Sequence, residues 1–324
     1  MRIGITFDTR EDYALSEYDN THADFSTLES IEYIASLLEK KGHSAVLIGS
    51  FDKLLARITS RGLGDIDIVF NTAEGLKNRN REGFVPSLLE AIRFPYVGTD
   101  AYGLGLTLNK LHTRIIAAHL GIRVARCVEI NHESDIPEAL GAIGVPCVLK
   151  PNLEGCSSGV ELIRDESSFI PNASRLLKVY DQTILCEEYI DGTEVVLPIV
   201  GNGASARVVG IVEIARRSNE PLGIFTLEDK LSQTCIKRIP NLSEYTKDKL
   251  VDHALRIHNY LGCADYNRVD FRIDPKGEAY MLEVNALPEM GEHSGFMLGC
   301  SLYGSDPADV LDEIVSCAAA RWGI

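Results

Sequence analysis

Two acidic residues and an amide, Asp270, Glu283 and Asn285, have the types and spacing expected of ligands for a metal ion. They belong to the segment 267–285, where the turn sequence DPKG at 274–277 separates two runs of alternating apolar and polar residues, a pattern that predicts a β-hairpin. Side chains alternate between the two faces of a strand, so the three polar side chains share one face. Because close carboxylates repel each other unless they are protonated or bind a cation, this face is a candidate Mg²⁺ site.

The register that we predict for this hairpin places Phe271 opposite Tyr280 on the apolar face and Arg268 opposite Glu283 on the polar face. The polar face has a purely structural alternative, because Arg268 and Glu283 can form an ordinary cross-strand ion pair at the surface. The hairpin alone does not decide between a metal site and such an ion pair.

A loop rich in glycine and serine, GCSSG at 155–159, follows a strand predicted at 146–150. The loop satisfies the GxSxG pattern of serine hydrolases, in which Ser157 would be the nucleophile. Such a serine lies between a strand and a helix, whereas four residues separate this loop from Lys150, and the segment 159–163 is predicted to be another strand. We keep a serine hydrolase as the less favoured alternative.

Strands and helices alternate in residues 1–100, which predicts an α/β domain with a doubly wound parallel sheet. The first helix is predicted to begin at the capping-box pattern Ser26-x-x-Glu29 and to end near Gly42. The domain lacks the GxGxxG pattern, so its fold alone does not indicate NAD. The predicted strands are 2–7, 45–48 and 66–70, and the other predicted helices are 51–59 and 85–92.

The pattern changes beyond residue 100, where one long helix is predicted at 107–120. From about residue 186 onward strands dominate, with helices predicted near 246–261 and 307–320. No low-complexity linker separates these parts. We therefore expect tightly packed domains with a cleft between them.

The composition of the 324 residues is that of a globular protein, with 45% hydrophobic and 24% charged residues. The net charge of −15 argues against nucleic acid and anionic membranes as partners. The segment 8–32 contains eight acidic residues and one arginine, and we interpret it as a solvated surface. None of the eight cysteines forms a CxxC pair, and no apolar run suits a membrane span or a signal peptide. We expect reduced thiols and a cytoplasmic protein that acts on small molecules, as a monomer or a homodimer.

Several motifs, ordered along most of the chain, are similar to those of the ATP-grasp superfamily and, within it, of the D-alanine–D-alanine ligase family. The motifs are PYVG at 95–98, Lys110, VLKPNLEGCSSG at 148–159, EEYI at 187–190 with GTE at 192–194, RVDF at 268–271 and LEVN at 282–285. The resemblance implies an ATP-grasp fold of the α/β class with an α+β C-terminal part. It divides the chain into an N-terminal doubly wound domain at 1–100, a central ATP-grasp subdomain at 101–186 and a C-terminal ATP-grasp subdomain at 187–324.

The chemistry that this resemblance implies is the ATP-dependent ligation of a carboxylate to an amine through an acylphosphate, with release of ADP. Asp270, Glu283 and Asn285 would bind two Mg²⁺ ions, with Mn²⁺ as a substitute. Arg268 would stabilise the oxyanion as a catalytic residue. Ser157, in the loop that would cover the phosphates, would be the second catalytic residue.

The resemblance also assigns residues to ATP. Lys110 and Lys150 would bind phosphates as point charges, and Glu194 would accept hydrogen bonds from the ribose hydroxyls. Backbone N–H groups of the loop 155–159 would cover the phosphates, since glycine allows a close approach. The residues implied in ATP binding are Lys110, Lys150, Gly155, Ser157, Ser158, Glu187, Glu188, Tyr189, Ile190, Glu194 and Lys230.

The substrate-binding half departs from the family pattern. Glu74 stands where the family has a histidine, and Glu289 replaces a glycine near the expected oxyanion. Arg79 and Arg81 follow Glu74, where they either hold a substrate carboxylate or belong to a solvated loop. The residues implied in substrate binding are Glu11, Glu74, Arg79, Arg81, Glu289 and Ser294. We therefore expect a ligase for amino acids or similar acids other than two D-alanines. The alternative is a true D-alanine–D-alanine ligase, and the full set of charged motif residues argues against a non-catalytic ATP-binding protein.

Overall fold

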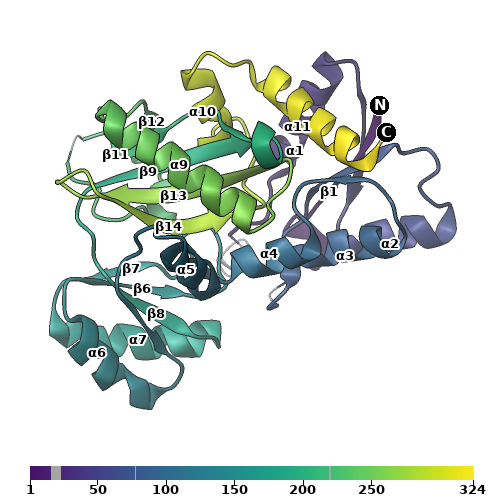
Figure 1. The fold of residues 1–324 in the computed structure, drawn as a ribbon. Helices are drawn as coiled ribbons and strands as arrows, with labels where there is room; N and C mark the ends of the chain where they lie inside the picture. The colour runs from purple at the N-terminus through teal and green to yellow at the C-terminus, as the bar shows by residue number, and fades with distance from the viewer. Residues whose placement is uncertain (16–22, 77, 219) are drawn as a thin grey trace.

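The computed structural model describes residues 1–15, 23–76, 78–218 and 220–324, whose strands form three sheets (Figure 1). The first sheet is parallel, in the order β2-β1-β3-β4. Its strands are β1 (Arg2–Phe7), β2 (Ser44–Gly49), β3 (Ile68–Thr72) and β4 (Tyr96–Val97).

Helices cover both faces of this parallel sheet. Alternate residues of β3 point to opposite faces, so Phe70 packs with α1 and α11 while Val69 packs with α2 and α3. The predicted doubly wound α/β domain is therefore confirmed, but one of its covering helices comes from the far end of the chain. The helices are α1 (Leu28–Lys40), α2 (Phe51–Ser60), α3 (Phe84–Ala91) and α11 (Pro307–Trp322).

Two boundaries in this domain differ from the prediction. The N-cap of α1 is Thr27, one residue later than expected, and its side chain accepts a hydrogen bond from Ser30 N at 3.2 Å. β3 begins at Ile68 rather than at Ile66, because Ile66 N donates to Leu63 O at 2.9 Å in a turn.

Two helices replace the single helix predicted at 107–120. The first ends at Leu108, because Asn109 has a ψ of 98° and leaves the helical region, and the second begins at Lys110. The side chain of Asn109 accepts a hydrogen bond from His112 N at 3.0 Å and so caps the second helix. The break makes Lys110 the first residue of a helix. The two helices are α4 (Ala101–Leu108) and α5 (Lys110–His119).

The second sheet is antiparallel, in the order β5-β8-β6-β7. Its strands are β5 (Cys127–Ile130), β6 (Cys147–Pro151), β7 (Glu161–Ile163) and β8 (Ile184–Glu188). Two helices pack against it in one hydrophobic cluster, and Figure 1 shows both on the side away from the other sheets. They are α6 (Ile136–Ile143) and α7 (Glu166–Tyr180).

The third sheet is antiparallel, in the order β12-β11-β9-β13-β14 with β10 beside β9. Helices α5 and α9 pack against one of its faces, and α10 packs against β9. The strands are β9 (Thr193–Val200), β10 (Arg207–Val208), β11 (Val212–Arg216), β12 (Cys235–Arg238), β13 (Tyr266–Ile273) and β14 (Ala279–Asn285). The remaining helices are α8 (Leu227–Leu231), α9 (Glu244–Tyr260) and α10 (Gly295–Leu302).

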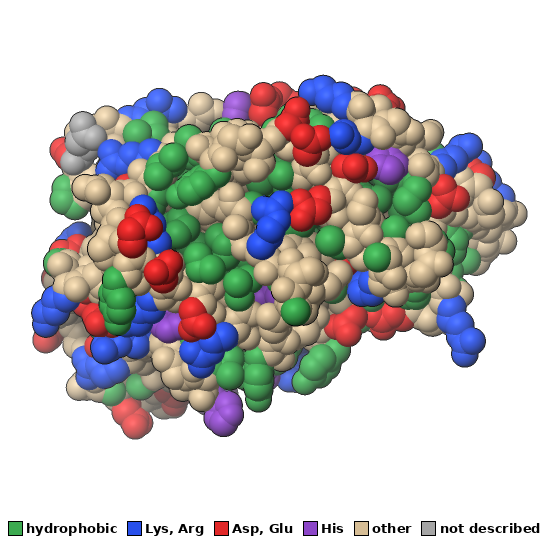
Figure 2. All heavy atoms as spheres, turned by 45° about the horizontal axis from the view of Figure 1, so that its top comes forward, with side chains coloured by type: hydrophobic (Ala, Val, Ile, Leu, Met, Phe, Trp, Pro, Cys, Tyr) green, Lys and Arg blue, Asp and Glu red, His purple; other side chains and the backbone are tan. Residues whose placement is uncertain are grey.

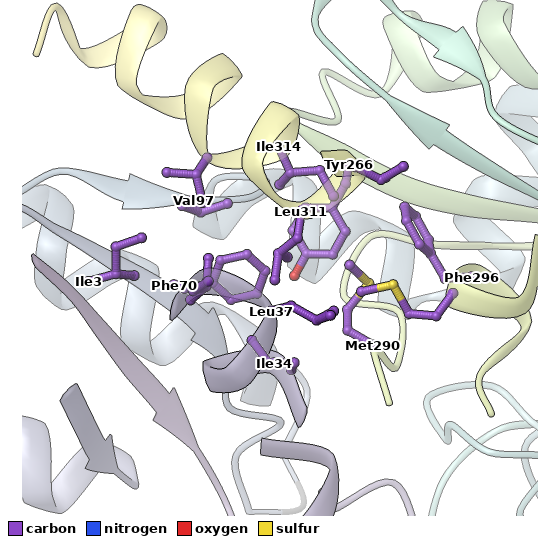
Figure 3. Packing of buried hydrophobic residues seen from close by; sticks show 14 of the residues in the cluster. Ile3, Ile34, Leu37, Phe70, Val97, Tyr266, Met290, Phe296, Leu311 and Ile314 are labelled. Carbon is purple, nitrogen blue, oxygen red and sulfur yellow. The ribbon is translucent and has the colours of Figure 1, made fainter. Parts of the chain in front are cut away.

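The first and third sheets share a hydrophobic core, which Figure 3 shows from close by. Tyr266 of β13 stacks on Phe70 of β3 with 5.7 Å between the ring centroids, and it meets Phe296 of α10 edge-on at 6.0 Å. Leu311 and Ile314 of α11 belong to the same cluster. This core holds the N-terminal domain against the C-terminal sheet and thereby fixes the walls of the cleft between them.

Acidic and basic side chains are interspersed on the face shown in Figure 2, and no continuous basic patch lies on that face. A nucleic-acid-binding surface is typically such a patch. No helix in the described ranges is long and apolar enough to cross a membrane.

Candidate active site

The hairpin of β13 and β14 brings the polar residues singled out in the sequence together. Asp270 lies directly opposite Glu283, and Arg268 lies opposite Asn285 rather than, as predicted, opposite Glu283. All four residues line one cavity. The structure thus gathers two carboxylates, an amide and a guanidinium at one end of the hairpin.

The apolar face of the hairpin also differs from the prediction. Phe271 pairs with Met281 instead of Tyr280, because a β-bulge leaves Leu282 without a partner on β13. Phe271 and Met281 are fully buried in the core. Leu282 lines a cavity on the other face of the sheet, so it belongs to the site and not to the core.

The two carboxylates have different partners. Asp270 accepts hydrogen bonds from Arg268 Nε at 2.7 Å and Nη2 at 2.8 Å, whereas Glu283 Oε2 lies 3.6 Å from Lys110 Nζ. Burial raises the pKa of Asp270 in spite of Arg268. Burial acts in the same direction on Glu283, but Lys110 and Lys150 outweigh it, so the pKa of Glu283 lies below its ordinary value.

The donor set formed by Asp270, Glu283 and Asn285 is small and consists of oxygen atoms. Asn285 Oδ1 accepts a hydrogen bond from Leu287 N at 3.1 Å. Within the described residues, no group of three His, Cys, Asp or Glu side chains could hold a metal by itself. Two carboxylates and an amide fit Mg²⁺, which completes its coordination with phosphate oxygens and water.

Buried cations lie around the same end of the hairpin. Lys110 Nζ donates to Glu154 O, and Lys150 Nζ lies 2.9 Å from Glu187 Oε1. Arg114 Nη1 also lies 2.9 Å from that oxygen, so one carboxylate serves two cations. The sequence analysis missed Arg114, although it follows Lys110 by one helical turn and therefore shares its face. The ammonium groups of Lys110 and Lys150 suit the binding of phosphates.

The loop 155–159 is a turn between two strands. Cys156 and Ser157 have positive φ angles of 51° and 60°, and Ser158 N donates to Gly155 O at 3.0 Å. Strand β7 follows the loop, where a nucleophile elbow requires a helix. The loop therefore lacks the geometry of a serine hydrolase. Two successive non-glycine residues in the left-handed region are costly, a strain that is typical of functional loops.

A cavity that we call the narrow cavity lies next to this loop. The residues implied in ATP binding that line it are Lys110, Lys150, Ser157, Ser158, Glu187, Glu188, Tyr189, Ile190 and Glu194. Asp270 and Glu283 line it as well, together with the apolar side chains of Ile224, Phe225 and Leu282. Apolar walls beside a few charged groups are typical of a small-molecule site.

Glu194 lines the narrow cavity, partly buried, beside an arginine that the sequence analysis missed. Burial raises the pKa of Glu194 to about 7, although Arg272 acts to lower it. Arg272 Nη1 lies 3.3 Å from Glu194 Oε2. The signal for Arg272 was present, because period-two alternation puts it on the same face as Arg268 and Asp270.

A wide cavity of about 690 Å³ adjoins the narrow one, and the predicted residues that line both are Lys110, Ser157, Glu194, Asp270 and Glu283. Its volume is in the usual range of ligand sites, about 300–1,000 Å³. The other predicted residues that line it are Glu74, Arg81, Gly155, Lys230, Arg268, Asn285, Glu289 and Ser294. Glu11 and Arg79 are exposed and line neither cavity, so the structure does not bring these two to the site.

Two substrate candidates on the C-terminal side of the wide cavity differ in setting. The side chain of Ser294 is buried and accepts a hydrogen bond from Met297 N at 3.0 Å, so Ser294 is the N-cap of α10 as well as a wall residue. Glu289 is exposed at the rim of the cavity.

Arg81 is buried at the N-terminal wall of the wide cavity among three carboxylates. Its Nη1 donates to Glu74 Oε2 at 2.8 Å, and its Nη2 lies 2.7 Å from Asp24 Oδ2 and 3.3 Å from Glu82 Oε1. Both terminal nitrogens thus lie within ion-pair distance of carboxylates of this chain, and a role of Arg81 in holding a substrate carboxylate stays a prediction. Burial raises the pKa of Glu82 to about 7, although Arg81 acts to lower it. Asp24 belongs to the acidic segment interpreted as solvated, and only the tertiary fold reveals its contact with Arg81.

Comparisons with known proteins agree with this geometry. A family model described as "D-ala D-ala ligase C-terminus" matches residues 116–316. A D-alanine–D-alanine ligase of Halalkalibacterium halodurans is 31% identical over 269 residues, which cover 82% of this chain and 85% of that protein. A D-alanine–D-alanine ligase of Bordetella petrii is 27% identical over 300 residues, which cover 90% of each.

A comparison of folds agrees with the family model. The crystal structure of a D-alanine–D-alanine ligase from Bacillus anthracis complexed with ATP matches 100% of this chain and 98% of that chain, with a TM-score of 0.75 at 22% identity. At this identity the match shows the fold, which is the predicted ATP-grasp fold. Taken with the family model, it establishes that the chain belongs to the D-alanine–D-alanine ligase family of ATP-grasp enzymes, which are ADP-forming ligases.

Proposed function

We propose that this chain uses ATP to join two D-amino acids, with D-alanine as the first candidate for both positions. The observation that carries the proposal is the opposition of Asp270 and Glu283 beside Lys110, where the narrow and wide cavities share their walls. This arrangement suits the transfer of a phosphoryl group from a nucleotide in the narrow cavity to a carboxylate in the wide one. The names of the relatives support D-alanine as the substrate.

In this reaction the γ-phosphoryl group of ATP passes to the carboxylate of the first amino acid, which gives an acylphosphate and ADP. The amine of the second amino acid then attacks the carbonyl carbon, and phosphate leaves from the tetrahedral intermediate. Lys110 and Lys150 would bind phosphates, and Arg268 would donate hydrogen bonds to the oxyanion. Asp270 and Glu283 would hold Mg²⁺, which neutralises charge during phosphoryl transfer when it is bound.

A different acyl donor is a second candidate, and the surroundings of Arg81 favour it. Three carboxylates, those of Asp24, Glu74 and Glu82, surround this single guanidinium. The wall is therefore acidic, and it favours a substrate that brings an amine or another cation over one with an extra carboxylate. Glu74 is the residue of this group that stands where the family has a histidine.

The two candidates are separated by measuring ADP release with single amino acids and with pairs, with L-amino acids as controls. ADP release with D-alanine alone, together with a dipeptide identified by mass spectrometry, supports the first candidate. A product that forms only when a basic or bulky amino acid is added supports the second. If no amino acid, alone or in any pair, causes the release of ADP, both candidates are wrong.

A further inference from the structure

Arg272 is a buried cation in the narrow cavity to which neither the sequence nor the proposed reaction gives a task. It lies on β13 two residues after Asp270, and only 4% of its side chain is exposed. Its neighbour on β9 is Glu194, and both residues line the narrow cavity. A buried charge is costly unless it is paired, so the partners of this guanidinium indicate what it does.

Three parts of the chain hold the guanidinium of Arg272 in place. Nη2 donates to Gly192 O at 3.3 Å and to Gly223 O, in the segment that precedes α8. The guanidinium lies over the ring of Tyr189, with 5.2 Å from its carbon to the ring centroid, and the hydroxyl of Tyr189 donates to Gly223 O at 3.3 Å. The planar group is thus fixed in position and in orientation.

This fixed group holds the carboxylate of Glu194. Nη1 of Arg272 binds Oε2 of Glu194, and among the described residues nothing donates to Oε1, which can therefore accept from a ligand. The Nε of Arg272 is buried and has no hydrogen-bond partner within the described residues, so it is a further donor at the same place. The acceptor Glu194 Oε1 and the donor Arg272 Nε, both beside the narrow cavity, match the hydroxyl groups and the ring oxygen of a sugar.

We propose that Arg272 makes the narrow cavity selective for a ribonucleotide, because it orients Glu194 toward the hydroxyl groups of the ribose. The inference rests on the proposed placement of ATP in this cavity and not on the identity of the amino acids. Arg272 is a positioning residue in this scheme, since it acts through Glu194. Loss of Arg272 removes the contact that orients the carboxylate of Glu194. Hydrogen bonds to charged groups contribute about 1.5–3 kcal/mol, which corresponds to a factor of about ten or more in affinity.

The test measures the binding of ATP, 2′-deoxy-ATP and 3′-deoxy-ATP by calorimetry, with Mg²⁺ and without any amino acid, so that no ligation begins. The wild type should bind ATP more tightly than at least one deoxynucleotide by about tenfold. Arg272→Met should reduce this preference to below about threefold, and Arg272→Lys should retain part of it, because lysine keeps the charge but loses the planar fork. Arg207→Met is the matched control, since Arg207 lies on β10 of the same sheet, pairs with Glu313 of α11 and lines neither cavity.

A double variant distinguishes positioning from a general effect on the pocket. Glu194→Gln alone should remove the preference for ATP, and adding Arg272→Met to it should change the preference no further. If Arg272→Met weakens the three nucleotides equally, the residue supports the fold only and the proposal is wrong. A wild type that binds the three nucleotides equally well contradicts it too. Because no amino acid is present, failure of the D-alanine assignment leaves these results unaffected.

Discussion

Asp270 and Glu283 face each other across the hairpin, yet each is paired with a different cation. Arg268 binds both oxygens of Asp270, at 2.7 and 2.8 Å, whereas Lys110 stays 3.6 Å from Glu283. Lys110 also donates to Glu154 O, so it keeps a partner when the charge of Glu283 is removed. Asp270, in contrast, is the ion-pair partner of the partly buried Arg268, yet burial raises its pKa in spite of that partner.

Asp270→Asn and Glu283→Gln should therefore lose activity alike but differ in stability. Each removes a carboxylate proposed for Mg²⁺, so ADP release should fall by about 100-fold or more. Asp270→Asn should not lower the free energy of unfolding of the metal-free protein, because burial raises the pKa of Asp270 and the native state therefore already disfavours this charge. Glu283→Gln should lower it by less than about 1 kcal/mol, because Lys110 and Lys150 hold the pKa of Glu283 below its ordinary value and its charge therefore stabilises the native state slightly. Urea unfolding without Mg²⁺ and an ADP-release assay check both parts, and wild-type turnover in either variant would rule out the metal assignment.

Ser157→Ala should keep ADP release within about tenfold of the wild type, the most that the loss of one neutral hydrogen bond explains. The reason is that the loop is a turn between β6 and β7 and is proposed to act through its backbone. A fluorophosphonate probe should not label Ser157. Ser157→Gly is the control for backbone strain, because glycine adopts the observed φ of 60° without cost. Stoichiometric labelling of Ser157 would support a hydrolase instead.

The substitution Glu82→Gln should stabilise the metal-free protein, and more so at high pH. The pKa of Glu82 is raised by burial from its ordinary value of 4.5 to about 7, so the native state binds its proton more tightly than the unfolded state. The cost of the buried charge is fully present above about pH 7 and disappears as the pH falls toward about 4.5. The midpoint of thermal unfolding should therefore differ by a few degrees between variant and wild type at pH 8 and converge near pH 4.5. A difference that grows as the pH falls would contradict the raised pKa.

Glu74→Gln and Glu289→Gly should have unequal effects on the choice of amino acid. Glu74 lines the wide cavity and binds Arg81 Nη1 at 2.8 Å, so its neutralisation changes the charge of the wall and releases the arginine. We expect the kcat/KM of Glu74→Gln for the acyl donor to change by about tenfold or more, with the KM for ATP unchanged. Glu289 is exposed at the rim, and its removal should change the ranking of amino acids by less than about threefold. The measurement is kcat/KM over a panel of alanine, basic, amide and bulky D-amino acids, and an unchanged ranking in Glu74→Gln would refute this account of specificity.

The polar face of the hairpin was predictable even though the predicted register was wrong. At the end with Arg268 and Asp270, the true pairing is shifted by two residues from the predicted one, and a shift of two returns each side chain to the same face. Near the turn the shift is one residue, which reverses the face and exchanges Tyr280 for Met281 opposite Phe271. The bulge that reconciles the two shifts has no local sequence signal, since neither proline nor glycine marks it.

Other parts of the site depend on tertiary contacts that periodicity does not encode. Asp24 is far in the chain from Glu74, Arg81 and Glu82, and its contact with Arg81 follows from the packing of loops around the parallel sheet. The break before Lys110 depends on one capping side chain, that of Asn109, within a continuous helical pattern. By contrast, Arg114 and Arg272 obey simple helical and strand periods, and the sequence analysis could have found them by extending those periods.

The position of α11 has a consequence for how the protein is made. Its apolar residues, among them Leu311 and Ile314, share a core with Ile3 and Phe70 of the first sheet. A chain emerging from the ribosome therefore completes the strands of its N-terminal sheet, and α1 on the same face, long before α11, which covers the rest of that face, exists. Until then the part of the face that α11 covers stays open to water and to other nascent chains, which makes it the place where association during synthesis would begin. A frameshift near the end of the gene would accordingly damage the domain that was translated first.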